Sequence, residues 1–352
     1  MQEEQTIQSF LTLFSILSFF VTLFIYKISD KIGNGILLDQ DFIKPQAFHK
    51  NPTARSGGLV AIILLSIFFM LYYLLFDNFL YQYFIICIAF FTLGFLDDIK
   101  IKINPNTRLA LMIIVLITSI TYFSIDIERI DLVFLENWLQ NKIFQTFFIL
   151  LCFLFIINGS NLIDGFNGLL VIHLLIINLV ILSININGDK NFVFLIIGQI
   201  IILFLFLLFN FPKAKMFFGD SGSYLFGSLA VMNIIETNNK NPEISSFFFC
   251  VILFYLFFEV FFSFFRKLLL KKSPLKPDDK HLHMLFYKYL ERSGKFIDSN
   301  YITSLFINLI YALFTLPIIF FKNNGIVCRY WFFSLLILYI IFYLRIYSFT
   351  KK

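Results

Sequence analysis

Long apolar runs separated by short polar segments fill most of the chain. Eleven runs can be marked, at residues 7–27, 58–76, 79–96, 109–125, 143–160, 168–187, 191–211, 221–235, 246–265, 302–321 and 329–348. A helix needs about 20 apolar residues to cross a lipid bilayer, so these runs predict membrane-spanning helices. The run at 221–235 is short and contains Gly222 and Gly227, which leaves about 10–11 spans.

The composition indicates the same class of protein. Of the 352 residues, 59% are hydrophobic and only 14% are charged, whereas soluble domains have about 45–50% apolar and about 25% charged residues. Phe contributes 52 residues and Gly only 15, which argues against disorder and collagen. We therefore predict an all-α, polytopic integral membrane protein that forms a single domain over residues 1–352.

Basic residues are distributed unevenly between the two sides that these spans define. If the N-terminus lies outside, the inner segments carry 22 of the 28 Lys and Arg residues. This asymmetry agrees with the positive-inside rule, by which cytoplasmic loops are rich in Lys and Arg. The first five residues hold two Glu and no basic residue, so the first run is expected to be a retained helix rather than a cleaved signal peptide. The net charge of +6 thus reports topology, and no basic groove with interleaved aromatic residues indicates nucleic-acid binding.

Polar residues gather in five clusters, all on the predicted inner side. The clusters cover residues 44–58, 94–109, 158–169, 218–223 and 276–283. Polar groups on one membrane face suggest an active site at the interface, whereas a transporter more often places them near mid-membrane on broken helices. The four cysteines lie far apart without metal-ligand spacing and are expected to act as small apolar side chains.

The acids in these clusters allow both structural and chemical roles. Asp97 and Asp98 are adjacent carboxylates that repel each other unless a cation lies between them, although charged pairs also end many membrane helices. Asp220 precedes a predicted helix and is either a ligand or a helix cap. Asp164 is followed by Gly165 and is either a ligand or part of a turn.

Two amides accompany Asp164 in the third cluster. Asn158 and Asn161 are three residues apart and share a helix face, so with Asp164 they form a polar stripe. Unpaired amides are costly in apolar surroundings. A stripe that ends in Asp-Gly is explained better by ligand contacts than by packing.

The fifth cluster contains two histidines in the most basic loop. The two-residue spacing of His281 and His283 does not place both on one helix face, which argues against zinc and favours contact with a phosphate or sugar. His173 lies alone in an apolar run and is expected to be structural. Glu259 is the one acid well inside a span, where it either pairs with a neighbouring helix or takes part in function. Arg266 lies on the same helix face two turns later.

Together these clusters resemble the polyprenyl-phosphate N-acetylhexosamine-1-phosphate transferases, the glycosyltransferase-4 family that includes phospho-N-acetylmuramoyl-pentapeptide transferase. The elements that carry the resemblance are Arg55-Ser-Gly-Gly58, Asp97-Asp-Ile-Lys100, Asn158 to Gly165, Gly219 to Ser223 and His281-Leu-His283. The match spans about residues 44–290. Two positions depart from the family pattern: Asn167 stands where relatives commonly carry a second Asp, and Met284 where many have a further His.

The resemblance implies transfer of N-acetylhexosamine-1-phosphate from a UDP-sugar to undecaprenyl phosphate, with release of UMP. It implies a multi-pass protein of the bacterial inner membrane with a cytoplasmic active site, Mg²⁺ or Mn²⁺ as cofactor, and allows a homodimer. Asp220, Asn161 and Asp98 are the implied metal ligands. The implied catalytic residues are Asp97, Asp98 and Asp164, and the implied substrate contacts are Lys44, Arg55, Asn158, Asn167, His281 and His283.

Several alternatives stay open at this point. The donor sugar, the glycan pathway and the oligomeric state are not determined by the sequence, although the incomplete His cluster disfavours a muramoyl-pentapeptide donor. A multi-span transporter or lipid flippase would give substrate counterflow without chemistry. A structural scaffold gives no reason for five polar clusters on one side.

Overall fold

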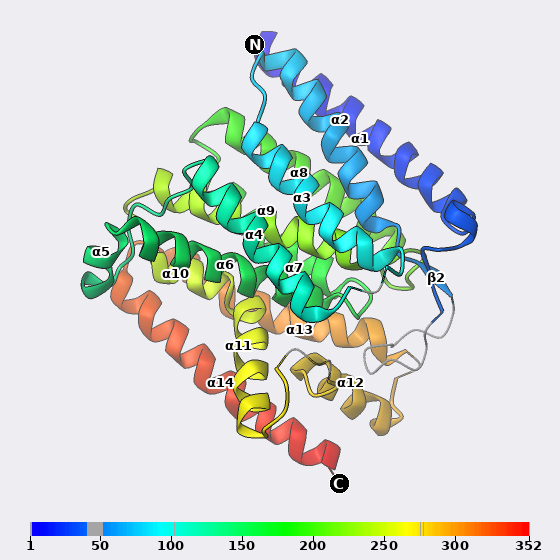
Figure 1. The fold of residues 1–352 in the computed structure, drawn as a ribbon, viewed down its shortest axis with the longest axis vertical. Helices are drawn as coiled ribbons and strands as arrows, with labels where there is room; N and C mark the ends of the chain where they lie inside the picture. Colours follow the sequence, from blue (N-terminus) through cyan, green and yellow to red (C-terminus); the bar gives the residue numbers. More distant parts are fainter. Residues whose placement is uncertain are drawn as a thin grey trace.

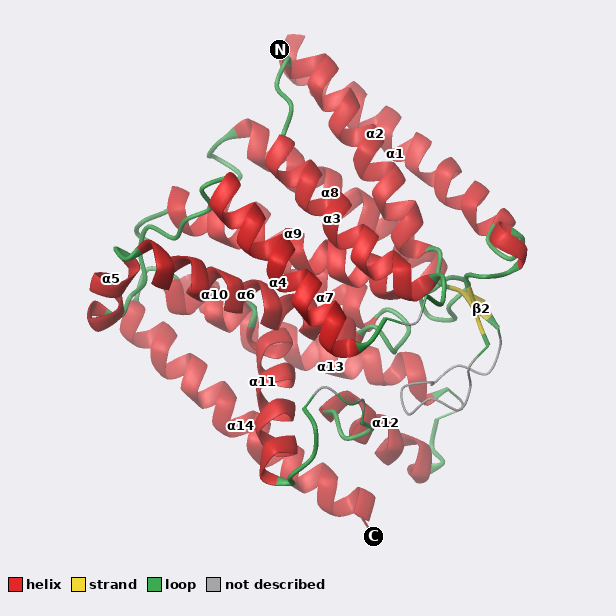
Figure 2. Ribbon diagram, in the orientation of Figure 1, coloured by secondary structure: helices red, strands yellow, loops and turns green. Residues whose placement is uncertain are grey.

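The protein is a bundle of long helices with one very short hairpin, as the ribbons in Figures 1 and 2 show. The computed structural model describes residues 2–40, 52–101, 103–274, 276, 278–296 and 298–351. The hairpin joins strands β1 (Leu38–Asp39) and β2 (Thr53–Ala54) in antiparallel register. The prediction of an all-α architecture is therefore confirmed apart from this hairpin.

Eleven helices make up the body of the bundle and follow the apolar runs of the sequence. They are α1 (Gln2–Ile28), α2 (Gly57–Phe76), α3 (Tyr81–Asp98), α4 (Pro105–Tyr122), α6 (Lys142–Ile163), α7 (Leu169–Asn185), α8 (Lys190–Asn210), α9 (Gly219–Lys240), α11 (Phe254–Leu269), α13 (Ser299–Thr315) and α14 (Gly325–Lys351). The shorter elements are α5 (Val133–Leu139), α10 (Ser246–Ile252), α12 (Leu282–Ser293) and the 3-10 turns η1 (Ile32–Asn34) and η2 (Pro317–Phe321).

The lengths and apolarity of these helices suit a membrane. Within the described residues, eight helices are long and apolar enough to cross it, and α10 with α11 adds a ninth if this pair, bent by 75°, is one span. Helix α7 is apolar but only 17 residues long. The chain is thus a multi-pass membrane protein, while the position of its N-terminus outside the cell stays a prediction.

Helix ends are set by local sequence signals. At the start of α4, Asn104 accepts a hydrogen bond from the backbone N–H of Asn106 at 3.1 Å, and Pro105 occupies the first helical position. Asp189 and Asp298 cap α8 and α13 in the same way. These side chains satisfy backbone donors that a helix leaves free in its first turn.

Helix α9 is the centre of the bundle, although its sequence run is the least apolar. It is 22 residues long and almost all of its side chains are buried, including four small residues of its first three turns, Ser221, Gly222, Ser223 and Gly227. Small side chains let neighbouring helices approach closely in membranes. Their presence explains why a weakly apolar run forms a central helix.

Gly94 of α3 makes one of these close approaches, to the first turn of α9. A Cβ at this position would collide with the backbone of Asp220 and Ser221. We expect Gly94→Ala to prevent α3 and α9 from packing and to abolish the yield of monodisperse protein in detergent, measured by size-exclusion chromatography. Gly325→Ala is the control, because a Cβ there has its nearest neighbour at 3.4 Å. Normal recovery of Gly94→Ala would contradict this packing.

Candidate active site

Charged residues from the ends of α3 and α6 and from the starts of α2, α4 and α9 come together near strand β2, which Figure 1 labels. Strand β2 leads into α2, and Ala54 forms a parallel bridge with Met216 just before α9. The backbone N–H groups of Gly57 and Gly58 donate to the carbonyls of Phe217 and Phe218 at 2.9 and 2.8 Å. These bonds bring the Arg55 segment against the start of α9.

Asp98 holds the first turn of α9 in place. This carboxylate is buried, and its oxygens accept hydrogen bonds from the backbone N–H groups of Asp220 and Ser221 at 3.0 and 2.9 Å. The Ser221 hydroxyl donates to Oδ2 of the same group at 2.5 Å. The carboxylate that caps α9 is therefore Asp98, supplied by another helix, and not Asp220.

Asp220 is left facing two arginines. Its Oδ2 lies 3.3 Å from Arg108 Nη1, and its Oδ1 lies 3.7 Å from Arg55 Nη1. Arg108 also forms an ion pair with Asp97. The side chains of Asp97, Asp220 and both arginines are all partly exposed, so this group can be reached by a ligand.

Arg55 links the hairpin to the acids. It donates to Asp39 Oδ2 from Nε at 3.0 Å and from Nη2 at 2.5 Å, while its Nη1 lies 3.8 Å from Asp98 Oδ1. Burial disfavours the charge of Arg55, but the carboxylates of Asp220, Asp39 and Asp98 outweigh this effect and raise its pKa above the ordinary value. The guanidinium is thus a fixed positive charge beside Asp220.

Asp164 belongs to the same group. Burial raises the pKa of its carboxyl well above the usual range, and the negative charge of Asp220 adds to the shift. Arg55 and the backbone N–H of Gly219 oppose it only in part. Asp164, at the end of α6, therefore lies within the field of acids that come from α3 and α9.

The acids exceed the arginines in this group. Five carboxylates, those of Asp39, Asp97, Asp98, Asp164 and Asp220, surround the guanidinium groups of Arg55 and Arg108. Oxygen ligands and an excess of negative charge suit a hard divalent cation such as Mg²⁺, which completes its shell with substrate phosphates and water. No three acidic, His or Cys side chains among the described residues are already arranged as a closed metal site.

Of the three amides in the third cluster, two make hydrogen bonds within the protein and one is partly exposed. Asn158 donates its side-chain N–H to the Leu154 carbonyl of its own helix at 2.7 Å. Asn161 is partly exposed on the same face. The side-chain N–H of Asn167 donates to the Pro212 carbonyl at 2.9 Å, and its backbone N–H donates to the side-chain oxygen of Asn300 at 2.8 Å. Asn167 therefore fixes the loop after Asp164 in this structure.

His281 and His283 lie in a second, buried cluster around Glu259. Their rings stack with centroids 5.6 Å apart, because His281 is extended at the N-cap of α12 while His283 lies within the helix. The two-residue spacing predicted that the histidines would not share a helix face, and the rings come together because His281 lies outside the helix. His283 packs edge-to-face on Phe166 at 5.5 Å, which links this cluster to the loop after Asp164.

Glu259 and His173 both pair with residues of other elements, as the packing interpretation of each predicted. Glu259 pairs across to His281, at 3.0 Å, and not with Arg266 of its own helix. His173 Nδ1 lies 3.2 Å from the side-chain oxygen of Asn308, and its ring packs on Tyr311. Both are buried contacts between elements.

Comparisons with known proteins identify relatives of this chain. The chain is 30% identical over 259 residues to the undecaprenyl-phosphate alpha-N-acetylglucosaminyl 1-phosphate transferase of Thermotoga maritima, which covers 70% of this chain and 75% of that protein. The model of glycosyl transferase family 4 matches residues 80–238. The chain belongs to glycosyl transferase family 4.

Two further relatives are more distant. The probable undecaprenyl-phosphate N-acetylglucosaminyl 1-phosphate transferase of Bacillus subtilis is 27% identical over 201 residues, 54% of this chain and 53% of that protein. A phospho-N-acetylmuramoyl-pentapeptide-transferase of Streptococcus pneumoniae is 28% identical over 207 residues, 55% of this chain and 62% of that protein. The chain thus spans about half to three quarters of the length of these relatives.

The structure adds to the candidate site two residues that were not assigned from the sequence. Arg108 stood in the second cluster without a role, and Asp39 stood in no cluster. Arg108 lies in the same cluster as the Asp97-Asp98 pair, ten residues after Asp98, and its charge could have suggested a role beside these acids. Asp39 reaches Arg55 only through the hairpin. Lys44, an expected substrate contact, lies outside the described residues.

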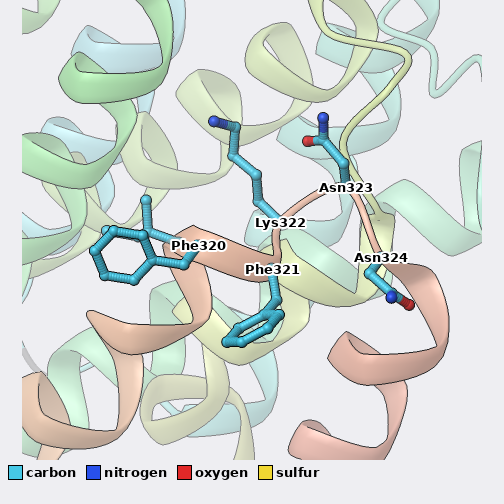
Figure 3. A pocket seen from close by; sticks show the side chains of 6 residues that line it. Phe320, Phe321, Lys322, Asn323 and Asn324 are labelled. Atoms are coloured by element: carbon cyan, nitrogen blue, oxygen red, sulfur yellow. The ribbon is translucent and has the colours of Figure 1, made fainter.

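A shallow depression at the α13–α14 connection lies away from this site. It is lined by residues 319–324, of which Figure 3 labels Phe320 to Asn324. The carbonyl of Lys322 accepts from the backbone N–H of Ser245, which follows the last turn of α9. Helix α9 begins at the acid cluster and is 22 residues long, which corresponds to about 33 Å. The depression therefore lies near the other end of α9, away from the acids. It contains no acid and is not part of the candidate site.

Proposed function

We propose that this protein transfers N-acetylhexosamine-1-phosphate from a UDP-sugar to undecaprenyl phosphate and releases UMP. The observation that carries the proposal is the position of Asp220 between Arg55 and Arg108, at 3.7 and 3.3 Å. A diphosphate needs positive charge, and a carboxylate beside it can hold a divalent cation. The activities for which the relatives are named, transfer of a sugar 1-phosphate or of a phospho-sugar peptide, supply the reaction class.

The reaction is a phosphoryl-type displacement. An oxygen of the lipid phosphate attacks the β-phosphorus of the nucleotide sugar, and the bond from that phosphorus to the bridging oxygen breaks. UMP leaves with the bridging oxygen and its electron pair, and the lipid keeps a sugar diphosphate. Such reactions depend mainly on positioning and on neutralisation of charge.

The residues of the acid cluster divide this work. Arg55 and Arg108 neutralise phosphate oxygens, which lets two anionic substrates approach each other. Asp97 positions the lipid phosphate through its ion pair with Arg108. The second pKa of a phosphate is about 6, so a strong base is not required. Asp98 acts indirectly, because it holds the turn of α9 that carries Asp220.

Mg²⁺ fits the donor set of this cluster. Asp220 would be its main protein ligand, with Asp98 and Asn161 as further candidates. When bound, the ion supplies neutralisation of the diphosphate charge. Both carboxylate oxygens of Asp98 already accept hydrogen bonds from α9, so Asp98 is a weaker candidate for a direct metal ligand than Asp220.

The remaining residues of the proposed site bind the substrates. Asn158, Asp164 and Asn167 lie along the end of α6 and are assigned to the nucleotide side. His281 and His283 are assigned to the phosphates or the sugar. We also propose that the site opens to the cytoplasm of a bacterial cell, on the side that the Lys and Arg distribution marks as inner.

An assay with purified protein tests this function. The protein is incubated with radiolabelled undecaprenyl phosphate and a panel of UDP-sugars, and the lipid product is identified by mass spectrometry. We expect UDP-N-acetylhexosamines to yield UMP and a lipid-linked sugar diphosphate in equal amounts, with loss of turnover on chelation by EDTA and recovery on addition of Mg²⁺. Turnover unaffected by EDTA would contradict the metal assignment. Counterflow of intact substrate in liposomes, with no UMP from any donor, would indicate a transporter.

A further inference from the structure

Glu259 is a buried acid that the proposed chemistry does not use. It lies on α11, beyond the bend from α10, and its side chain is only 1% exposed. A buried carboxylate is stable only with partners that replace the water it has lost. The identity of these partners indicates what the residue does.

Glu259 faces the start of α12, and the side chains of Tyr255 and Tyr339 also interact with its carboxylate. Oε2 is 3.0 Å from His281 Nδ1, and Oε1 accepts from the backbone N–H of Leu282 at 3.2 Å. Oε1 is also 3.7 Å from His283 Nδ1, which lies 3.2 Å from the Tyr255 hydroxyl. One carboxylate therefore caps α12 and faces the same ring atom of both histidines.

The contact restricts the protonation of His281. A carboxylate only accepts hydrogen bonds, so Nδ1 of His281 must carry a proton to make this contact. Its Nε2 is left buried without a hydrogen bond within the described part of the chain. This atom is 3.5 Å from Asp278 Oδ1, and Asp278 is held in turn by Arg266 at 2.9 Å. Glu259 and Arg266 lie on one face of α11. They bind the two ends of the segment that contains His281, Glu259 at Leu282 and Arg266 at Asp278.

We infer that Glu259 is the positioning residue for the His281–His283 pair, which its carboxylate orients and keeps protonated at Nδ1 of His281. A carboxylate that orients an imidazole in this way fixes its tautomer and ring angle. His283 of this pair packs on Phe166, two residues after Asp164, so the orientation of the pair bears on the edge of the acid cluster. The functional consequence, but not the geometry, rests on the proposed function.

Nitrogen-15 NMR of histidine-labelled protein in detergent tests the geometry directly. The chain has only four histidines, and the His281 signal is assigned by its loss in His281→Asn. The wild-type signal should show a protonated Nδ1. In Glu259→Gln one oxygen becomes an NH₂ donor, so the proton of His281 is expected to move to Nε2. A wild-type His281 without a proton on Nδ1 would overturn the inference, whether or not any variant folds.

Kinetics supply a second, separable readout. Loss of a residue that orients a functional imidazole commonly lowers activity about 10- to 100-fold, and we expect this loss in kcat for Glu259→Gln, with partial rescue in Glu259→Asp. The matched control is Lys267→Met, because Lys267 tethers the same loop through the carbonyls of Pro274 and Lys276 at 3.1 and 2.7 Å without touching the histidines. It should leave the His281 signal unchanged.

The two hypotheses fail in different ways. An unchanged His281 signal and unchanged kcat in Glu259→Gln would refute the positioning role, as would an equal change of the signal in Lys267→Met. A wild-type protein that shows the expected His281 signal but makes no UMP from any donor would refute the proposed function and leave the geometry of Glu259 standing.

Discussion

Asp220→Asn should lower the turnover of UMP release about 10²- to 10³-fold, the range seen when one preorganised electrostatic group is removed from an active site. Asparagine keeps the size of the side chain but removes the negative charge between Arg55 and Arg108. Because the N-terminus of α9 is capped by Asp98 and not by Asp220, the fold should be unaffected. The measurement is kcat at saturating UDP-N-acetylglucosamine and lipid phosphate.

A matched control lies at the opposite end of the bundle. Asp189 pairs with Lys240 at 2.6 Å and caps α8, and asparagine can retain the cap. Asp189→Asn should keep near-normal turnover. If Asp220→Asn also turned over normally with unchanged dependence on Mg²⁺, Asp220 would have no place in the metal or diphosphate site.

Asp98→Ala should both inactivate and destabilise the protein. It removes the acceptor of two α9 N–H groups and leaves Arg55, 3.8 Å away, with one carboxylate fewer. Breaking a buried charged interaction costs about 3–5 kcal/mol. We expect a clear fall in the midpoint of thermal unfolding in detergent, measured by circular dichroism, together with loss of UMP release.

Ser221→Ala separates the hydrogen bond from the charge. It removes only the hydroxyl that donates to Asp98 at 2.5 Å and leaves both backbone bonds in place. Its expected cost is about 1 kcal/mol, a typical value for one hydrogen bond. If Asp98→Ala were no less stable than Ser221→Ala, the assignment of Asp98 as the support of α9 would be wrong.

The sequence was sufficient to predict the helices and the grouping of the acids. Apolar runs reveal spans because each must be long enough to cross the bilayer, and even the weak run at 221–235 forms part of α9. Alternating spans then placed Asp97, Asp98, Asp164 and Asp220 on one side, where the structure brings them together. The order of apolar and polar segments along the chain is enough to predict both the helices and the side on which the acids lie.

The roles of individual side chains could not be predicted in the same way. Asp97 and Asp98 are neighbours in sequence, yet one meets Arg108 and the other caps α9, because successive helix residues point about 100° apart. Tertiary packing determines the bend between α10 and α11 and the extended backbone at His281. The contact between Glu259 and the histidines depends on both features. The hairpin that brings Asp39 to Arg55 has strands of two residues, too short for a periodic signal.

The most direct measurement is an experimental structure of the protein with Mg²⁺ and UDP-N-acetylglucosamine in the absence of lipid acceptor, so that no transfer takes place. We predict the diphosphate between Arg55 and Arg108, with the metal ion on Asp220 and the uridine toward Asp164. A diphosphate bound elsewhere, with Asp97 and Asp220 still paired to the arginines and Asp98 still bound to α9, would contradict the proposed site.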